Sequence, residues 1–274
     1  MNHVDVAALG VNLLVSAVIV AVVLLGTFAY ALRSGVHAIM DSMWSLGFVI
    51  IAAVTFALSS GKGNDTVRTV VLVLTALWGL RLSGYIFLRN RGTGEDPRYA
   101  ALLRHSRGNP TLFVLRRVYW AQGKVMWWIS LPIQVVMYER AAPGVLTWIG
   151  VSVWAIGLGF ESVGDLQLAR FKREPANHGR ILDRGLWSLT RHPNYFGDAT
   201  LWWGLWLVSC NQWIGLLTVT SPLLMNYMLV KRTGKALLEK GMRRSRGAAY
   251  EEYVARTSGF LPRRQRASAP QTPR

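Results

Sequence analysis

The stretch VNLLVSAVIVAVVLLGTFAYAL, residues 11–32, contains no charged side chain over 22 consecutive positions. At about 1.5 Å per residue, a helix of this length crosses the roughly 30 Å hydrocarbon core of a bilayer. Further apolar runs occupy residues 42–60, 69–88, 125–138, 144–160, 199–209 and 213–230. Runs 125–138 and 199–209 are short, so tilt, flanking aromatic residues or broken helices are expected there. The sequence therefore predicts an all-α, polytopic membrane helix bundle of about seven transmembrane helices.

The chain is strongly basic, with a formal net charge of +17 over 274 residues. In a soluble protein this charge would indicate nucleic acid, but here it alternates with long apolar runs, so no nucleic-acid partner is expected. Cys210 is the single cysteine, which excludes an intrachain disulfide and argues against a cysteine-based metal site. The first ten residues lack a cationic segment, so a cleaved signal peptide is not expected.

The distribution of Lys and Arg predicts the orientation. If the N-terminus faces out, seven spans leave 27 basic residues in the inner segments and three, Lys62, Arg68 and Arg140, in the outer ones. The positive-inside rule then gives N-out and C-in. Basic inner loops serve topology and attract anionic lipid without any further role. We expect a single domain over residues 1–262 and a basic, disordered tail over 263–274.

The segment 161–198 gathers polar residues at the inner end of the fifth predicted span. Glu161 and Asp165 are spaced i, i+4 on one helix face, and Arg170, Lys172 and Arg173 follow. Two like charges on one face repel unless a cation or hydrogen-bond donors lie between them. A helix-end cluster of salt bridges is the alternative to a binding site.

The string RHPNYFG, residues 191–197, predicts the start of a new helix after the loop ANHGRILDRG. Pro193 suits a first helical position, with His192 as a possible cap residue. A helix N-terminus flanked by Arg191 and Asn194 is favourable for an anion, and Tyr195 offers a ring for stacking. The tail segment YEEYVARTSGFLP, residues 250–262, places Tyr250, Tyr253 and Arg256 on one helix face, or forms an interfacial amphipathic helix.

Four strings together, DLQLARFK, GLWSLTRHPNYFGD, WWGLWL and YEEYVARTSGFLP, resemble the steroid 5-alpha-reductase-like membrane proteins. The nearest branch is a bacterial one described only as a domain of unknown function. The similarity is strongest over 161–262 and fainter in DSMWSLGF (41–48), WGLRLSGYIFLRNRG (78–92) and EDPRY (95–99). The resemblance implies seven transmembrane helices with NADPH in the inner half of the bundle.

By position, the resemblance implies that NADPH contacts Asp165, Lys172, Arg180, Asn194 and Asp198, with Asn90 and Arg91 as further contacts. With the helix-start and tail residues, the full set expected to bind the cofactor is Asn90, Arg91, Asp165, Lys172, Arg180, Arg191, His192, Asn194, Tyr195, Asp198, Tyr250, Tyr253 and Arg256. Lys172 stands where the steroid enzymes have arginine and therefore lacks bidentate phosphate binding. Asp198 stands where glutamate is more usual.

The steroid enzymes polarise the substrate carbonyl with a glutamate and a tyrosine. Residues 33–60 contain no glutamate here; Asp41 has the most similar position, and Tyr85 matches the tyrosine. A phenol backed by a carboxyl group stabilises the charge that hydride transfer to an enone builds on its oxygen. Asp41 has alternative roles as a helix cap or as a partner for Arg33 or Arg81.

The RHPNYFG string also resembles the isoprenylcysteine carboxyl methyltransferases and bacterial phospholipid methyltransferases, which bind S-adenosylmethionine. Glu239 and residues 250–262 fit their tails. We favour the reductase because the inner segments are rich in cations, whereas a cationic methyl donor needs carboxylates and aromatic faces. A non-enzymatic lipid-binding protein and a transporter are weaker alternatives. We expect a hydrophobic, lipid-like substrate, and a bacterial plasma membrane location with the site on the cytoplasmic side.

Overall fold

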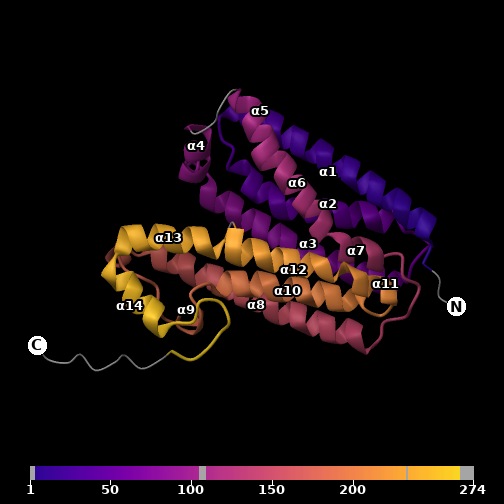
Figure 1. The fold of residues 1–274 in the computed structure, drawn as a ribbon. Helices are drawn as coiled ribbons and strands as arrows, with labels where there is room; N and C mark the ends of the chain where they lie inside the picture. The colour runs from indigo at the N-terminus through magenta and orange to yellow at the C-terminus, as the bar shows by residue number, and fades with distance from the viewer. Residues whose placement is uncertain (1–3, 105–108, 233, 266–274) are drawn as a thin grey trace, which may run out of the picture. The chain divides into compact units, whose positions relative to one another are not determined.

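The computed structural model describes residues 4–104, 109–232 and 234–265. These residues form helices and loops, with no β-strand among them (Figure 1), which confirms the predicted all-α class. Five helices are long and apolar enough to cross a membrane, and the chain is therefore a membrane protein with several spanning helices. They are Val6–Ser34, Ile39–Leu58, Asp65–Asn90, Val145–Arg173 and Trp213–Arg246.

The described chain divides into two compact units, the first within residues 1–148 and 205–221 and the second within 149–204 and 222–274. The first unit begins with α1 (Val6–Ser34), and local chemistry sets both of its ends. The side chain of Asp5 accepts a hydrogen bond from the amide of Ala8 at 2.9 Å, which satisfies a free donor of the first turn. Gly35 ends the helix with a φ of 72°, a conformation that glycine adopts without strain.

In the first unit, α1 packs with α2 (Ile39–Leu58) and α7 (Leu131–Val136), and both α2 and α7 pack with α3 (Asp65–Asn90). A Cβ at Gly79 of α3 would lie 2.8 Å from the carbonyl oxygen of Ser45, so the α2–α3 crossing depends on this glycine. The buried side chain of Gln134 accepts hydrogen bonds from Asn12 at 3.1 Å and from Ser16 at 2.6 Å. These polar links fix α7 against α1, as is typical of membrane helices.

The two short apolar runs do not form long single helices. Within 125–138, α6 (Ala121–Ile129) ends before α7, where Pro132 interrupts the helix. A π-helical turn, η1 (Leu115–Trp120), joins α6 to α5 (Pro110–Val114). The run 199–209 belongs to α10 (Pro193–Ser209), whose 17 residues span about 26 Å. The expectation of a broken helix is confirmed for 125–138, whereas 199–209 lies within one continuous helix; seven complete spans remain a prediction.

The second unit is organised by the contact of α8 (Val145–Arg173) with α10. A Cβ at Gly204 would lie 2.6 Å from the amide nitrogen of Trp154, and one at Gly157 would lie 2.5 Å from that of Leu201. A Cβ at Gly197 would clash with the backbone of Glu161. These glycines thus allow the backbones of α8 and α10 to pack closely, and the polar residues near the end of α8 lie next to the start of α10.

The C-terminal part of the second unit contains shorter helices. They are η2 (Pro175–Asn177), α9 (Leu186–Leu189), η4 (Met228–Arg232), α13 (Lys235–Arg246) and α14 (Ala248–Arg256), and α12 (Thr220–Tyr227) belongs to this unit from residue 222 onward. Of the predicted tail 263–274, residues 266–274 lie outside the described residues. The amide of Arg263 donates to the carbonyl of Leu189 at 2.9 Å, so the beginning of this tail is held against α9.

Candidate functional site

The RHPNYFG string begins α10 as predicted, with Pro193 as the first helical residue. The carbonyl of His192 accepts the amide of Phe196 at 3.0 Å. The side chain of Asn194 accepts the amide of Tyr195 at 3.0 Å. His192 immediately precedes the first helical residue and is therefore the cap residue, as predicted, while its imidazole contacts Glu239. Asp198 lies one turn further along α10 and is half-buried.

Asp165 and Asn194 meet at this helix start. The Asn194 amide nitrogen donates to the Asp165 carboxylate at 3.2 Å. Asp165 and its neighbour Glu161 are 5% and 3% exposed, so two carboxylates lie buried on one face of α8. The prediction that Glu161 and Asp165 share one face of α8 is confirmed. The side-chain amide of Asn194 is one of the hydrogen-bond donors that offset the repulsion between the two carboxylates. A carboxylate beside an amide is a suitable pair for hydroxyl groups of a ligand.

Arg191 and His192 share one carboxylate, that of Glu239 on α13. The guanidinium donates to Glu239 Oε1 at 3.0 and 2.9 Å, and His192 Nε2 lies 3.1 Å from the same oxygen. The His192 ring stacks on Tyr195, with centroids 5.6 Å apart and planes 7° apart. Burial lowers the pKa of His192, although the hydrogen bond to Glu239 opposes this. The imidazole is therefore neutral at pH 7.

Arg191 also holds the C-terminal segment in place. Its guanidinium donates to the carbonyl oxygens of Thr257 at 2.6 Å and Val254 at 3.3 Å, and its amide donates to that of Ser258 at 2.9 Å. Thr190 adds a hydrogen bond to the carbonyl of Phe260 at 2.9 Å. These donors are directed at protein acceptors, so Arg191 organises the site from within.

The three predicted residues of α14 lie on one face, as the spacing requires. Tyr250 and Tyr253 are both 3% exposed, with ring centroids 6.1 Å apart. Tyr253 donates to the carbonyl of Trp187 at 2.6 Å, and Arg256 forms an ion pair with Asp183. Burial, with the negative charge of Glu239, raises the pKa of Tyr250 to about 12. This face of α14 packs against the 183–187 segment.

A cavity of about 420 Å³ lies at the C-terminal end of α8, and its polar lining residues include Gln167, Arg170, Glu174 and Arg184. Gly185 closes one side with a φ of 61°, and Gln167 accepts the following amide, that of Leu186, at 3.0 Å. The predicted cofactor residues Lys172 and Arg180 lie within the same stretch of chain, and both are exposed. Two arginines on the cavity wall suit an anionic ligand.

In the first unit, Asp41 lies in the first turn of α2. Tyr99, on α4 (Pro97–Arg104), donates to Asp41 Oδ1 at 2.7 Å, and Arg98 donates to Oδ2 at 2.7 Å. Burial, then the negative charge of Asp41, raises the pKa of Tyr99, so this phenol keeps its proton. Tyr85 lies on α3 with the Arg89 guanidinium 5.7 Å from its ring centroid. The Asp41–Tyr85 pairing remains a prediction.

The remaining predicted residues of the first unit end α3. Asn90 is the last helical residue, and Arg91 follows as its cap with extended backbone. Asn90 Oδ1 accepts a hydrogen bond from Arg89 at 3.2 Å, and its carbonyl accepts one from Thr93 at 2.8 Å. Both residues therefore belong to a short turn, which the RNRG string indicates.

Three features were not predicted from the sequence. Tyr99 was part of the EDPRY string but had no assigned role, and Arg170 and Arg184 had no specific role beyond their charge. Glu239 was connected only with the methyltransferase alternative, and its contact with Arg191 and His192 joins residues 47 and 48 positions apart. The EDPRY string pointed to Tyr99 only through the family resemblance, since its contact with Asp41 joins residues 58 positions apart. No local pattern indicates the contacts of Glu239.

Comparison with known proteins gives the family. A helical membrane protein with several spanning helices is the class that the fold defines. Residues 27–257 match the family described as "Protein of unknown function (DUF1295)". This match covers most of the chain, and the chain belongs to this family.

A curated relative matches a short part of the chain. It is a "Probable O-methyltransferase ustE" of Ustilaginoidea virens, 42% identical over 53 residues. The match covers 19% of this chain and 18% of the relative, so the chain spans only a small part of that protein's length. No solved structure matches the chain.

Proposed function

We propose that this protein is an NADPH-dependent membrane reductase that acts on a carbon–carbon double bond in a lipid or steroid-like enone. The cavity at the inner end of α8 carries the proposal, because Arg170 and Arg184 line it and Lys172 and Arg180 lie in the same stretch. Cationic side chains at this density suit a ligand with several phosphates. S-Adenosylmethionine has no phosphate and carries a positive charge.

The residues at the start of α10 and the end of α8 fit NADPH. Asp165 and Asn194, in contact at 3.2 Å, would hold sugar hydroxyl groups. Arg170, Lys172, Arg180 and Arg184 would hold phosphates, and Asp198 and Tyr195 complete the set that the second unit contributes. When bound, NADPH supplies the hydride.

The phenol and carboxyl groups of the first unit would polarise the substrate carbonyl. Asp41 is the carboxyl group, and Tyr99, which contacts it at 2.7 Å, joins Tyr85 as a candidate phenol. A protonated phenol donates a hydrogen bond to an oxygen on which negative charge develops. The raised pKa of Tyr99 keeps this phenol protonated at neutral pH, and its O–H would turn from Asp41 Oδ1 to the substrate oxygen. Substrate binding from the membrane follows from the apolar spans.

Ligand titration of the detergent-purified full chain tests the proposal. NADPH, NADH and S-adenosylmethionine are added in parallel, and the thermal midpoint is followed, because a ligand that binds only the folded state raises it. We expect NADPH to stabilise the protein. Arg184→Gln, Arg180→Ala and Asn194→Ala each weaken its binding by about tenfold or more, as expected for lost hydrogen bonds to charged or polar ligand groups.

The matched control is Arg173→Gln, which removes an exposed charge next to Lys172 without touching the cavity lining. It should leave the NADPH affinity within about twofold, on the scale of a surface charge. Equal weakening by Arg173→Gln and Arg184→Gln would indicate unspecific charge attraction and would contradict the assigned phosphate contacts. Failure of NADPH to stabilise the wild-type chain would refute the reductase.

The second candidate function is an S-adenosylmethionine-dependent membrane methyltransferase of the isoprenylcysteine or phospholipid type. Two observations favour it: the partial match to a probable O-methyltransferase and the carboxylates Glu161, Asp165 and Glu239 around the start of α10. Buried carboxylates and the Tyr195 ring suit a sulfonium cation. Stabilisation by S-adenosylmethionine alone, lost in Glu239→Gln, would establish this function and remove Asp41, Tyr85 and Tyr99 from the catalytic set.

The distribution of basic residues also supports a topology. We infer that the chain crosses a bacterial plasma membrane seven times, with the N-terminus on the outer side and the C-terminus on the cytoplasmic side, because the segments then assigned to the inner side hold 27 basic residues. In this topology both the α8 cavity and the start of α10 face the cytoplasm, where NADPH is available.

A further inference from the structure

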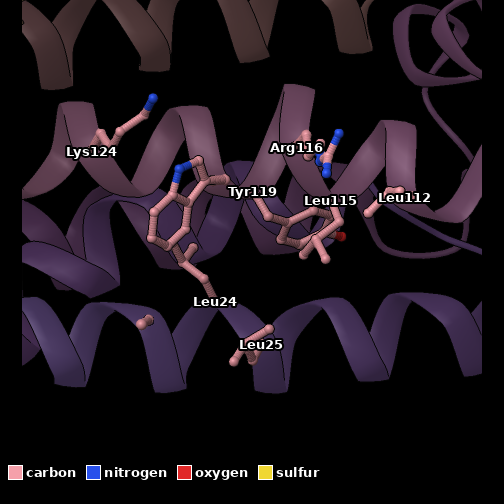
Figure 2. Close-up of a pocket in the computed structure, with 9 residues that line it drawn as sticks. Leu24, Leu25, Leu112, Leu115, Arg116, Tyr119 and Lys124 are labelled. Atoms are coloured by element: carbon pink, nitrogen blue, oxygen red, sulfur yellow. The ribbon is translucent and has the colours of Figure 1, made fainter.

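A groove of about 580 Å³ lies on the first unit between α1 and the helical run formed by α5, η1 and α6. Figure 2 shows Leu24 and Leu25 of α1 facing the helix that carries Leu115 and Tyr119. The helices approach closely at Gly123, where a Cβ would clash with the Leu24 side chain. The volume is typical of small-molecule and lipid sites.

The floor of the groove is fixed before any ligand binds. Tyr119 is buried, and its hydroxyl lies 3.0 Å from His37 Nδ1. The amide of His37 donates to the Glu95 carboxylate at 2.6 Å, and the Tyr119 ring packs edge-on against Phe28 with centroids 4.9 Å apart. A floor held by several contacts lowers the entropic cost of binding.

The charged groups of the groove are both cationic. Arg116 and Lys124 line it and are exposed, and its lining contains no carboxylate. They are eight residues apart on one helical run, which is about 12 Å. Trp120 lies between them in sequence and is 58% exposed, and tryptophan is enriched at the level of lipid headgroups. The remaining wall is aliphatic, contributed by Ala21, Leu24, Leu25, Leu112 and Leu115.

We propose that this groove binds an anionic phospholipid of the surrounding membrane, with an acyl chain along α1 and the phosphate at Arg116 and Lys124. The two cationic side chains favour a negatively charged headgroup, because basic pockets between membrane helices bind such headgroups. The aliphatic wall favours an acyl chain. This site is separate from the proposed reductase site and does not depend on which cofactor the second unit takes.

Binding of radiolabelled dioleoyl phosphatidylglycerol to the detergent-purified full chain tests the proposal. Unlabelled phosphatidylglycerol should displace the label, and phosphatidylcholine with the same chains should compete at least about tenfold less well because its headgroup is neutral. Arg116→Gln and Lys124→Gln should each weaken binding about fivefold, the effect of one basic group near a lipid surface. Ala21→Phe fills the groove while keeping both cations, and should also abolish high-affinity binding.

Arg117→Gln is the matched control, because Arg117 is exposed, adjacent in sequence and outside the lining. Its affinity should stay within about twofold of wild type. Three results would overturn the proposal: equal competition by phosphatidylcholine, equal weakening by Arg117→Gln and Arg116→Gln, or unchanged binding in Ala21→Phe. Thermal midpoints of all variants show that each protein is folded, and NADPH or S-adenosylmethionine binding reports separately on the proposed function.

Discussion

At the scale of single residues, Glu139 is a carboxylic acid enclosed by the protein in the turn between α7 and α8. Its side chain is 2% exposed, and no described residue hydrogen-bonds to its Oε1. A Cβ at Gly215 would lie 3.1 Å from that oxygen. Burial therefore raises the pKa of Glu139 to about 8, because the charged form has lost its water.

This raised pKa predicts an unusual pH dependence. Between the ordinary carboxyl pKa and about 8, the folded state keeps a proton that the unfolded state has released, so stability falls as the pH rises through this window. Glu139→Gln should match wild type near pH 5 and exceed it at pH 9 by roughly 1–3 kcal/mol. Thermal midpoints across pH 5–9 measure this. Glu252→Gln, at an exposed position, should show no such trend; a constant difference for Glu139→Gln would contradict the prediction.

His192 predicts the opposite trend at lower pH. Burial lowers its pKa, so the unfolded state binds a proton first as the pH falls below about 6.5. Stability is then lost on acidification until the folded imidazole also becomes protonated. His192→Gln should show a shallower loss of thermal stability between pH 7 and 5.5 than wild type. His178→Gln, which changes an exposed histidine, should keep the wild-type slope, and identical slopes for all three proteins would exclude this role.

At the scale of elements, the α8–α10 contact depends on glycine. Gly197→Ala places a methyl group against the backbone of Glu161 and Gly157, and we expect a loss of about 1–3 kcal/mol or more, as for overpacking. Gly159→Ala, on the partner helix α8 and with open space around it, should instead be neutral or stabilising by up to about 1 kcal/mol. Thermal unfolding in detergent compares the two. Equal effects would show that helix propensity, and not close packing, governs these positions.

The elements also show what the sequence can and cannot predict. The long apolar runs predicted α1, α2, α3 and α8 because hydrophobic length is a local property. RHPNYFG predicted the start of α10 because proline chemistry is local as well. The Glu239 contacts were not assigned, since they join α13 to a segment nearly fifty residues earlier. Tyr99 reaches Asp41 across 58 positions, and no local sequence pattern indicates such a contact.

At the scale of the whole molecule, the predicted topology is open to a direct test. Cys210 is the chain's one cysteine. In a Cys210→Ala background, the labelling of one introduced cysteine at a time can therefore be measured. Ser60→Cys follows α2 and Ser245→Cys lies on α13, and both positions are exposed. With the N-terminus outside, a membrane-impermeant maleimide on intact cells should label Ser60→Cys, and Ser245→Cys only after lysis. The reverse pattern would invert the topology; labelling of both in intact cells would exclude seven spans.

The hydrogen bonds of Arg191 and Thr190 to residues 254–260 also determine when the α9–α10 junction can form during synthesis. The acceptors emerge from the ribosome almost seventy residues after the donors, a delay of roughly 3–14 s at 5–20 residues per second. Until then the α9–α10 junction lacks its closing partner, and insertion of the earlier helices precedes it. The junction is therefore closed only when residues 254–260 arrive, and a nascent chain released before that segment lacks these contacts.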